Sequence, residues 1–148
     1  MKISEIKVKN LNSDYSVFIG TNILNILPKK IKSISPKTNK IGIVVDSKVP
    51  KKFLIKIKKL LKNYELFIFK RSSSEKFKSY KNINIIVEKC LKQNFNRSDI
   101  LISLGGGIIG DFSAFAASMI KRGLGFINIP TTLLAQVDSA IGGKTGVN

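Results

Sequence analysis

The stretch ILISLGGGIIGD (residues 100–111) decides the fold, because an apolar run leads directly into three consecutive glycines. The run from Ile100 to Leu104 is short and continuous, which is typical of a strand buried on both faces of a parallel sheet. Glycines after such a strand permit a tight turn, and the mostly small and apolar residues 112–120 predict a helix. We therefore expect a strand, a glycine-rich turn and a helix, in that order.

The same alternation of apolar runs and amphipathic segments extends on both sides of this stretch. Short apolar runs predict further strands at residues 40–46, 66–69 and 126–129. Helical spacing of apolar residues predicts helices at 49–61 and 80–91. From residue 40 onward, strands and helices therefore alternate. This order predicts an α/β fold, with a mostly parallel sheet and helices on both faces.

The amino-terminal segment has a different pattern. Residues 3–8 and 15–19 alternate between apolar and polar side chains, which predicts two strands joined by a turn. Thr21 and Asn22 then offer an N-cap for a helix, whereas Pro28 opposes the continuation of that helix. We expect all these elements to belong to one domain that spans residues 1–148.

The charge of the chain is strongly positive and unevenly distributed. There are 26 Lys and Arg against 9 Asp and Glu, a net charge of +17. Residues 1–100 carry 23 of the basic and 7 of the acidic residues, whereas residues 101–148 carry 3 and 2. The excess is almost all lysine, without the arginines and aromatic platforms that are typical of nucleic-acid sites. We interpret it as a solvated face, with a polyanion-binding surface as the alternative.

The composition excludes several other classes of site. The chain has one Cys and no His, which excludes an internal disulfide, a Cys/His zinc site and a His-based catalytic triad within it. A single Cys fits a reducing compartment. No apolar run is long enough to predict a membrane span, and the first residues lack the apolar core of a signal peptide. We expect a cytoplasmic protein that binds neither membranes nor nucleic acids.

Ligands of open parallel sheets bind beyond the carboxyl ends of the strands. In this chain, those ends are followed by loops after Asp46, Lys70, Leu104 and Ile129. The turn after Leu104 favours phosphate binding, because glycines let backbone amides approach closely and the helix N-terminus adds partial positive charge. The alternative is close packing of the helix on the sheet, since the spacing departs from the fingerprint G-x-G-x-x-G. For Asp111, the alternative is an acid favoured by the helix dipole.

Further polar candidates lie in two other loops. Thr131 and Thr132 can bond a ligand, but their position before an apolar helical run favours capping. Asp138 comes late in that apolar run, so its carboxylate requires a partner. Lys144 is isolated in the least charged part of the chain, which favours it as a site residue. The loop SSSEKFK (residues 72–78) also follows a carboxyl end, although its residue types alone favour an exposed charged loop.

Several motifs, taken in order, resemble one family. They are LGGGIIGD at 104–111, Arg122-Gly123, IPTTLLAQVDS at 129–139 and GGKT at 142–145. This combination is similar to 3-dehydroquinate synthase of the shikimate pathway. The resemblance implies a lyase that converts 3-deoxy-D-arabino-heptulosonate 7-phosphate to 3-dehydroquinate. The reaction proceeds with transient oxidation by NAD and elimination of phosphate, and serves chorismate and aromatic amino acid biosynthesis.

The resemblance also implies roles for individual residues. It gives Lys144, Asp138 and Arg122 to catalysis, with Arg122 reaching a substrate phosphate across a dimer interface. It places the glycine-rich turn along the NAD diphosphate and ribose, and the two threonines at the nicotinamide half. Ser74 stands where the family usually has Gly, which puts the geometry of that loop in doubt. The residues that it implies in NAD binding are Asp46, Glu75, Lys78, Gly106, Gly107, Ile108, Ile109, Gly110, Asp111, Thr131, Thr132, Asp138 and Lys144.

The resemblance further implies a Rossmann-like NAD domain followed by a helical domain that binds a divalent metal, zinc or cobalt. The metal ligands of the family, a Glu and two His, lie downstream of the last shared motif, so we expect no metal ligand here. We interpret residues 1–148 as the N-terminal part of a homodimeric enzyme, without the C-terminal metal-binding domain and inactive alone. The alternatives are a related NAD-dependent sugar-phosphate cyclase, a metal-dependent polyol dehydrogenase and, least favoured, a non-catalytic basic binding module.

Overall fold

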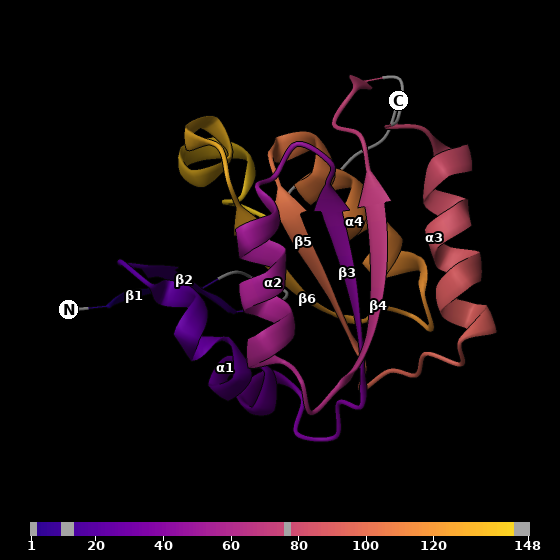
Figure 1. Cartoon of the computed structure of the whole chain (residues 1–148), viewed down its shortest axis with the longest axis horizontal. Helices are drawn as coiled ribbons and strands as arrows, with labels where there is room; N and C mark the ends of the chain where they lie inside the picture. The colour runs from indigo at the N-terminus through magenta and orange to yellow at the C-terminus, as the bar shows by residue number, and fades with distance from the viewer. Residues whose placement is uncertain (1–2, 10–13, 76–77, 144–148) are drawn as a thin grey trace.

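A four-stranded parallel sheet forms the centre of the computed structural model, which describes residues 3–9, 14–75 and 78–143 (Figure 1). The strand order is β4-β3-β5-β6, and each connection between consecutive strands contains a helix. The strands are β3 (Lys40–Asp46), β4 (Glu65–Arg71), β5 (Ile100–Gly105) and β6 (Gly125–Pro130). The connecting helices are α2 (Lys51–Leu60), α3 (Tyr80–Lys92) and α4 (Gly107–Met119).

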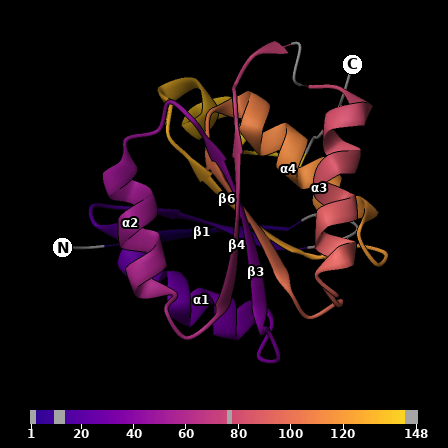
Figure 2. The ribbon, with the colours of Figure 1, turned by 45° about the vertical axis from the view of Figure 1, so that its right-hand side comes forward.

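Helices cover both faces of the sheet, which confirms the predicted α/β architecture (Figures 1 and 2). Helices α3 and α4 pack on one face, and α2 packs on the other together with α1 (Leu27–Ile34). Alternate residues of each central strand therefore enter different cores. Val44 packs with α3 and α4, whereas its neighbours Ile43 and Val45 pack with α1 and α2. This two-sided burial explains why β3 and β5 appear in the sequence as continuous apolar runs.

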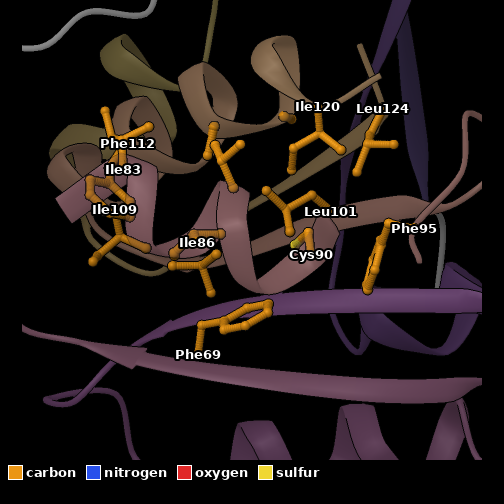
Figure 3. Packing of buried hydrophobic residues seen from close by; sticks show 14 residues of the cluster. Phe69, Ile83, Ile86, Cys90, Phe95, Leu101, Ile109, Phe112, Ile120 and Leu124 are labelled. Atoms are coloured by element: carbon orange, nitrogen blue, oxygen red, sulfur yellow. The ribbon is translucent and has the colours of Figure 1, made fainter. Parts of the chain in front are cut away.

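The core beneath α3 and α4 is densely filled (Figure 3). Ile86 and Cys90 from α3 lie against Leu101 of β5, and Phe69 and Phe95 border this cluster. Burial raises the pKa of the Cys90 thiol to about 12, because the apolar surroundings penalise the thiolate. The single cysteine is therefore a packing residue.

The amino-terminal segment forms a separate antiparallel hairpin of β1 (Ser4–Val8) and β2 (Tyr15–Ile19), as predicted. The helix that follows differs from the prediction. It begins as a short 3-10 turn, η1 (Ile23–Ile26), and Asn22 adopts a left-handed conformation without a side-chain cap. Pro28 does not oppose α1, because it lies in the first turn, where its missing N–H costs no hydrogen bond.

Helix α4 begins earlier than the apolar pattern predicts. It starts at Gly107, so residues 107–111 are helical. Helix propensity alone disfavours such a glycine-rich start, and packing on the sheet overrides it. As a consequence, Gly105 and Gly106 are the residues that make the turn from β5. None of the helices in the described part of the chain is long and apolar enough to cross a membrane.

Candidate functional site at the carboxyl edge of the sheet

The chain reverses its direction of winding between β3 and β5. After β3 it moves to β4 on one side of the sheet, and after β5 it moves to β6 on the other. Such a switch point opens a crevice beyond the carboxyl ends of the two strands. We call the carboxyl ends of β3–β6, with the loops that follow them, the carboxyl edge; it lies at the top of Figure 1. Asp46 and Gly105 therefore end the two strands that flank this crevice.

The first turn of α4 presents hydrogen-bond donors at this switch point. Gly106 has an extended backbone and precedes the helix, and the Gly110 N–H donates to the Gly106 carbonyl at 3.0 Å. The N–H groups of Gly107, Ile108 and Ile109 consequently have no acceptor within the helix. Three orphan donors and the positive end of the helix dipole together favour an anion such as a phosphate.

Close packing explains two of the glycines. A Cβ atom at Gly105 would lie 2.8 Å from the Ile109 Cβ atom, and one at Gly107 would lie 2.6 Å from the Ser139 Oγ atom. Neither position accepts a side chain without movement of its neighbour. The packing interpretation of the glycines therefore holds, and it is compatible with an anion site, because the backbone N–H groups remain available.

Ile109 and Gly110 contribute to the packing of α4. The Ile109 side chain is buried in the core, and Gly110 lies against the side chain of Asn128 on β6. The Gly110 N–H is already bonded within the helix. The contact of these two residues with NAD, which the resemblance implies, remains a prediction. Because the Ile109 side chain is buried, only its backbone N–H could bind NAD.

Asp46 is buried at the end of β3, with 6% of its surface exposed. Its Oδ1 atom accepts a hydrogen bond from the Lys48 N–H at 3.0 Å, and this bond shapes the turn into α2. The loop after β3 thus satisfies one of the two carboxylate oxygens of Asp46. Arg71 ends the neighbouring strand, and burial lowers the pKa of its guanidinium below the ordinary arginine value.

The structure brings together two candidates that are 33 positions apart in the sequence. Lys78, in the loop after β4, donates to the Asp111 Oδ2 atom on α4 at 2.9 Å. Both side chains are largely buried, with 18% and 21% of their surfaces exposed. Glu75 is exposed and lies in the same loop. This loop is therefore attached to the first turns of α4, and it is not the freely solvated loop that its composition favours.

The threonines after β6 lie next to the glycine-rich turn. The Thr131 N–H donates to the Gly105 carbonyl at 2.9 Å, and the Thr132 side chain is the nearest neighbour on the Cβ side of Gly106. The Thr132 Oγ1 atom accepts from the Ala135 N–H at 3.2 Å. The predicted capping role of Thr132 is confirmed, and both residues lie at the carboxyl edge.

Asp138 belongs to the π-helical turn η3 (Ala135–Ser139). The expectation that its carboxylate requires a partner is wrong, because the apolar side chains around it are not buried. Leu133, Leu134 and Val137 are 76%, 70% and 68% exposed, and Asp138 is exposed as well. Among the residues that the structure describes, no side chain bonds this carboxylate, and its exposure removes the desolvation cost that would demand a partner.

Arg122 lies at the opposite end of α4. The helix has 13 residues, so it separates Arg122 from the glycine-rich turn by about 20 Å. Lys121, Arg122 and Gly123 all have positive φ values of 51°, 71° and 108°, and Arg122 is exposed. This placement excludes a direct contact with a ligand at the carboxyl edge of the same chain. Contact of Arg122 with a substrate phosphate in a partner subunit, which the resemblance implies, remains a prediction.

Two further predictions concern Lys144 and metal ions. Lys144 lies outside the described residues. Within the residues that the structure describes, no three His, Cys, Asp or Glu side chains lie close enough to hold a metal ion.

Two polar residues at this edge were missed from the sequence. The Ser139 Oγ atom is buried and has no hydrogen-bond partner within the described part of the chain. Asn128 accepts a hydrogen bond from the buried Ser103 hydroxyl across β5 and β6 at 2.5 Å. The strand register supplies the reason for the second contact, because Ser103 and Asn128 are paired positions. No feature of the sequence indicates the position of Ser139.

These features define an open, doubly wound α/β domain with a glycine-rich turn and a helix N-terminus at its switch point. The family model described as 3-dehydroquinate synthase N-terminal matches residues 68–148. The chain therefore belongs to the 3-dehydroquinate synthase family, and the match concerns the N-terminal part of that family.

Similarity extends over the whole chain. The 3-dehydroquinate synthase of Pelagibacter ubique (strain HTCC1062) is 49% identical over 148 residues, which are 100% of this chain and 40% of that protein. The enzyme of the same name from Campylobacter concisus (strain 13826) is 44% identical over 97% of this chain and 39% of that protein. The chain thus spans about two fifths of the length of these relatives.

Solved structures share the fold. A complex of 2-deoxy-scyllo-inosose synthase with carbaglucose-6-phosphate, NAD+ and Co2+ matches with a TM-score of 0.88 and 23% identity, over 98% of this chain and 39% of that one. The 2-epi-5-epi-valiolone synthase of Streptomyces hygroscopicus subsp. jinggangensis 5008, with NAD+ and Zn2+ bound, matches with a TM-score of 0.78 and 26% identity, over 95% and 39%. Sugar-phosphate cyclases are thus close structural neighbours of this chain.

Proposed function

We propose that residues 1–148 form the NAD-binding domain of a 3-dehydroquinate synthase. The enzyme would be a lyase that converts 3-deoxy-D-arabino-heptulosonate 7-phosphate to 3-dehydroquinate, in aromatic amino acid biosynthesis. One observation carries the proposal: the start of α4 places three orphan N–H groups at the switch point of a domain that is 49% identical over its whole length to a protein of that name. We further propose a cytoplasmic homodimer as the complete enzyme.

The residues of the carboxyl edge fit a dinucleotide. The N–H groups of Gly107, Ile108 and Ile109 would bind the diphosphate, which is the anionic part of NAD. Asp46 at the end of β3 would accept a hydrogen bond from the adenosine ribose through its second oxygen. Thr131 lies beside Gly105 and would face the nicotinamide half. When bound, NAD would supply reversible oxidation of a substrate carbinol.

Three further side chains would act on the substrate. Asp138 is exposed at this edge, and its charge is available to a substrate hydroxyl. The ammonium group of Lys144 would stabilise developing oxyanion charge. The guanidinium of Arg122 would bind the substrate phosphate of a partner subunit, because a bidentate donor suits phosphate and its own carboxyl edge is too far away.

A divalent metal does not fit this chain. It has no His, and the described residues include no cluster of potential ligands. The zinc or cobalt of the proposed enzyme would therefore depend on residues beyond these 148. We propose that the chain alone binds NAD and releases no phosphate from 3-deoxy-D-arabino-heptulosonate 7-phosphate.

Isothermal titration of the 148-residue chain with NAD tests this proposal. We expect saturable binding with a Kd between about 1 µM and 1 mM, the range of typical enzyme substrates. Gly107→Val should weaken binding by at least about tenfold, because the new side chain meets Ser139 and displaces the first turn of α4. Glu88→Gln on the exposed face of α3 is the matched control and should bind as the wild type does. Absence of NAD binding by the folded chain would refute the proposed function.

A related sugar-phosphate cyclase is the second candidate. The structural similarity to 2-epi-5-epi-valiolone synthase favours it, although identity there is 26% against 49% to the Pelagibacter protein. NAD binding does not separate the two candidates, since both use the same domain. Conversion of 3-deoxy-D-arabino-heptulosonate 7-phosphate by the complete enzyme would favour the first, and conversion of a different sugar phosphate but not of this one would favour the second.

A further inference from the structure

Strand β4 forms an open edge of the parallel sheet. It pairs with β3 on one side, and no strand of the described chain pairs with its other side (Figure 1). The Glu65 N–H donates to the residue before β3, and the Arg71 carbonyl accepts from the residue after β3. Because successive residues of a strand direct their N–H and C=O groups to alternate sides, Leu66, Ile68 and Lys70 direct theirs away from the sheet. A further strand could pair with these outward groups.

This edge has little of the protection that natural edge strands carry. Lysines, prolines and bulges commonly prevent a second chain from pairing with such a strand. Only the end of β4 is blocked, where the Arg71 guanidinium donates to the Lys70 carbonyl at 2.8 Å. Leu66 and Ile68 are apolar and half-buried, and within the described part of the chain no other segment bonds their outward backbone groups. The unprotected part of the edge is therefore the stretch around these two residues.

A groove of about 420 Å³ lies beside this stretch, between β4 and the end of α3. It is lined by residues 66–69 of β4 and by Lys89, Lys92 and Gln93 of α3. Its volume falls within the range of about 300 to 1,000 Å³ that is usual for ligand clefts. Apolar surface and free backbone groups thus lie together with two lysines.

The two lysines indicate the charge of an occupant. Lys89 and Lys92 are exposed, and neither forms an ion pair with a residue that the structure describes. The neighbouring acid, Glu88, accepts a hydrogen bond from the Asn84 amide at 2.9 Å. The helix dipole favours lysines at this end of α3, but it does not explain the open strand beside them. A second copy of the chain is disfavoured as the occupant, because it carries the same lysines and a net charge of +17.

We propose that the open edge of β4 and the groove beside it bind an extended acidic segment of a partner protein by strand addition. The backbone of the partner would pair with the outward groups of Leu66 and Ile68, and its carboxylates would contact Lys89 and Lys92. Main-chain hydrogen bonds provide affinity in this mode, and alternate side chains provide specificity. The groove adjoins the end of α3, whereas the carboxyl edge adjoins its start, so the inference does not depend on NAD binding.

Titration of the 148-residue chain with a labelled, end-blocked peptide of sequence Glu-Val-Glu-Val-Glu-Val-Glu tests this proposal. The same peptide with lysine in place of each glutamate is the control for charge. The combination of Lys89→Glu with Lys92→Glu alters the groove. The combination of Lys58→Glu with Lys59→Glu is the matched control, because these exposed lysines lie in the last turn of α2 and the change in net charge is the same. Thermal unfolding checks that both variants are folded.

We expect saturable binding of the glutamate peptide and none of the lysine peptide. The α3 variant should bind the glutamate peptide at least about tenfold more weakly, and the α2 variant within about twofold of the wild type. Amide hydrogen exchange, followed by NMR spectroscopy, should slow at Leu66 and Ile68 when the peptide binds. The amides of Phe67 and Phe69 face β3 and should exchange slowly even in the free chain.

Three results would overturn the inference. Equal weakening in the α2 and α3 variants would indicate a general attraction to the positive charge of the chain. Binding without slower exchange at Leu66 and Ile68 would exclude strand addition, and absence of binding at about 1 mM peptide would exclude the site itself. Slow exchange at these two amides in the free chain, if it depends on protein concentration, would indicate a second copy at this edge and would also contradict the proposal.

Discussion

Two acidic residues at opposite edges of the parallel sheet, Asp99 and Asp111, are satisfied in different ways. We call the amino ends of the strands, with the loops that precede them, the amino edge. There, Asp99 is fully buried, and its carboxylate accepts hydrogen bonds from the N–H groups of Asn39, Lys40 and Asn96 at 3.2, 2.8 and 2.8 Å. At the carboxyl edge, Asp111 is one fifth exposed and pairs with a lysine side chain. Three backbone N–H groups hold Asp99 in the fold, whereas Asp111 is held through a side chain.

Other contacts follow the same division. At the amino edge, the hydroxyls of Ser35 and Thr38 both donate to the Ser98 carbonyl, at 2.7 and 2.8 Å, and join the end of α1 to the loop before β5. At the carboxyl edge, the first turn of α4 keeps N–H groups without intrahelical acceptors. Bonds at the amino edge thus join separate segments of the fold, whereas the carboxyl edge leaves N–H groups without intrahelical acceptors at the place where we propose that NAD binds.

The largest expected effect is on stability at the amino edge. Asp99→Ala should lower the free energy of unfolding by about 3 kcal/mol, because three N–H groups lose the charged acceptor that the buried Asp99 side chain provides. Urea denaturation monitored by circular dichroism measures this change. Glu88→Ala on the exposed face of α3 should stay within about 0.5 kcal/mol. A loss below about 1 kcal/mol for Asp99→Ala would remove the contrast between the two edges.

A smaller effect on stability is expected at the glycine-rich turn. Gly107→Ala should cost about 1 to 3 kcal/mol, since the added Cβ atom would lie 2.6 Å from the Ser139 Oγ atom. The combination of Gly107→Ala with Ser139→Gly should recover part of this loss, because the opposing side chain is removed. Thermal and urea unfolding of both variants provide the comparison. If the second substitution adds its own cost and recovers nothing, close packing does not explain the glycine.

The core that supports both edges should resist modification. Burial raises the pKa of Cys90 to about 12, so at about pH 8 the reactive thiolate is scarce. As the pH rises above the ordinary thiol value towards 12, the unfolded chain ionises first, which lowers stability there. We expect no reaction of the native protein with a thiol reagent at about pH 8 and rapid reaction in concentrated urea. Rapid labelling of the native chain would show that this core opens.

The smallest effect is expected outside the parallel sheet, between the amino-terminal hairpin and α1. Glu5 and Lys30 form an ion pair of 3.8 Å with 39% and 30% of their side chains exposed. Glu5→Gln should therefore change the free energy of unfolding by less than about 0.5 kcal/mol, and salt should abolish even this difference. A larger change in a urea titration would mean that charge in the hairpin matters as much as charge at the edges of the sheet.

The parallel sheet could be predicted because β3 and β5 are buried on both faces and therefore appear as continuous apolar runs. The location of the candidate site at the carboxyl edge could be predicted from the alternation of strands and helices, because ligands of such sheets bind beyond the carboxyl ends of the strands. The contact of Lys78 with Asp111 could not be predicted, because it joins segments 33 residues apart through the turn of a loop. The role of Asp99 was missed for the same reason, since Asn39 and Lys40 reach it only across the sheet. The early start of α4 was missed because glycine has low helix propensity. In the structure, close packing requires glycine at this position although the segment is helical.

A titration of the isotopically labelled chain with NAD, followed by amide NMR spectroscopy, tests most directly whether the carboxyl edge is a dinucleotide site. We expect saturable chemical-shift changes at the amides of residues 106–109 and at Asp46, while the amides of residues 96–99 at the amino edge stay constant. Changes confined to the amino edge or to the lysine-rich helix α2, or no change at millimolar NAD, would contradict it.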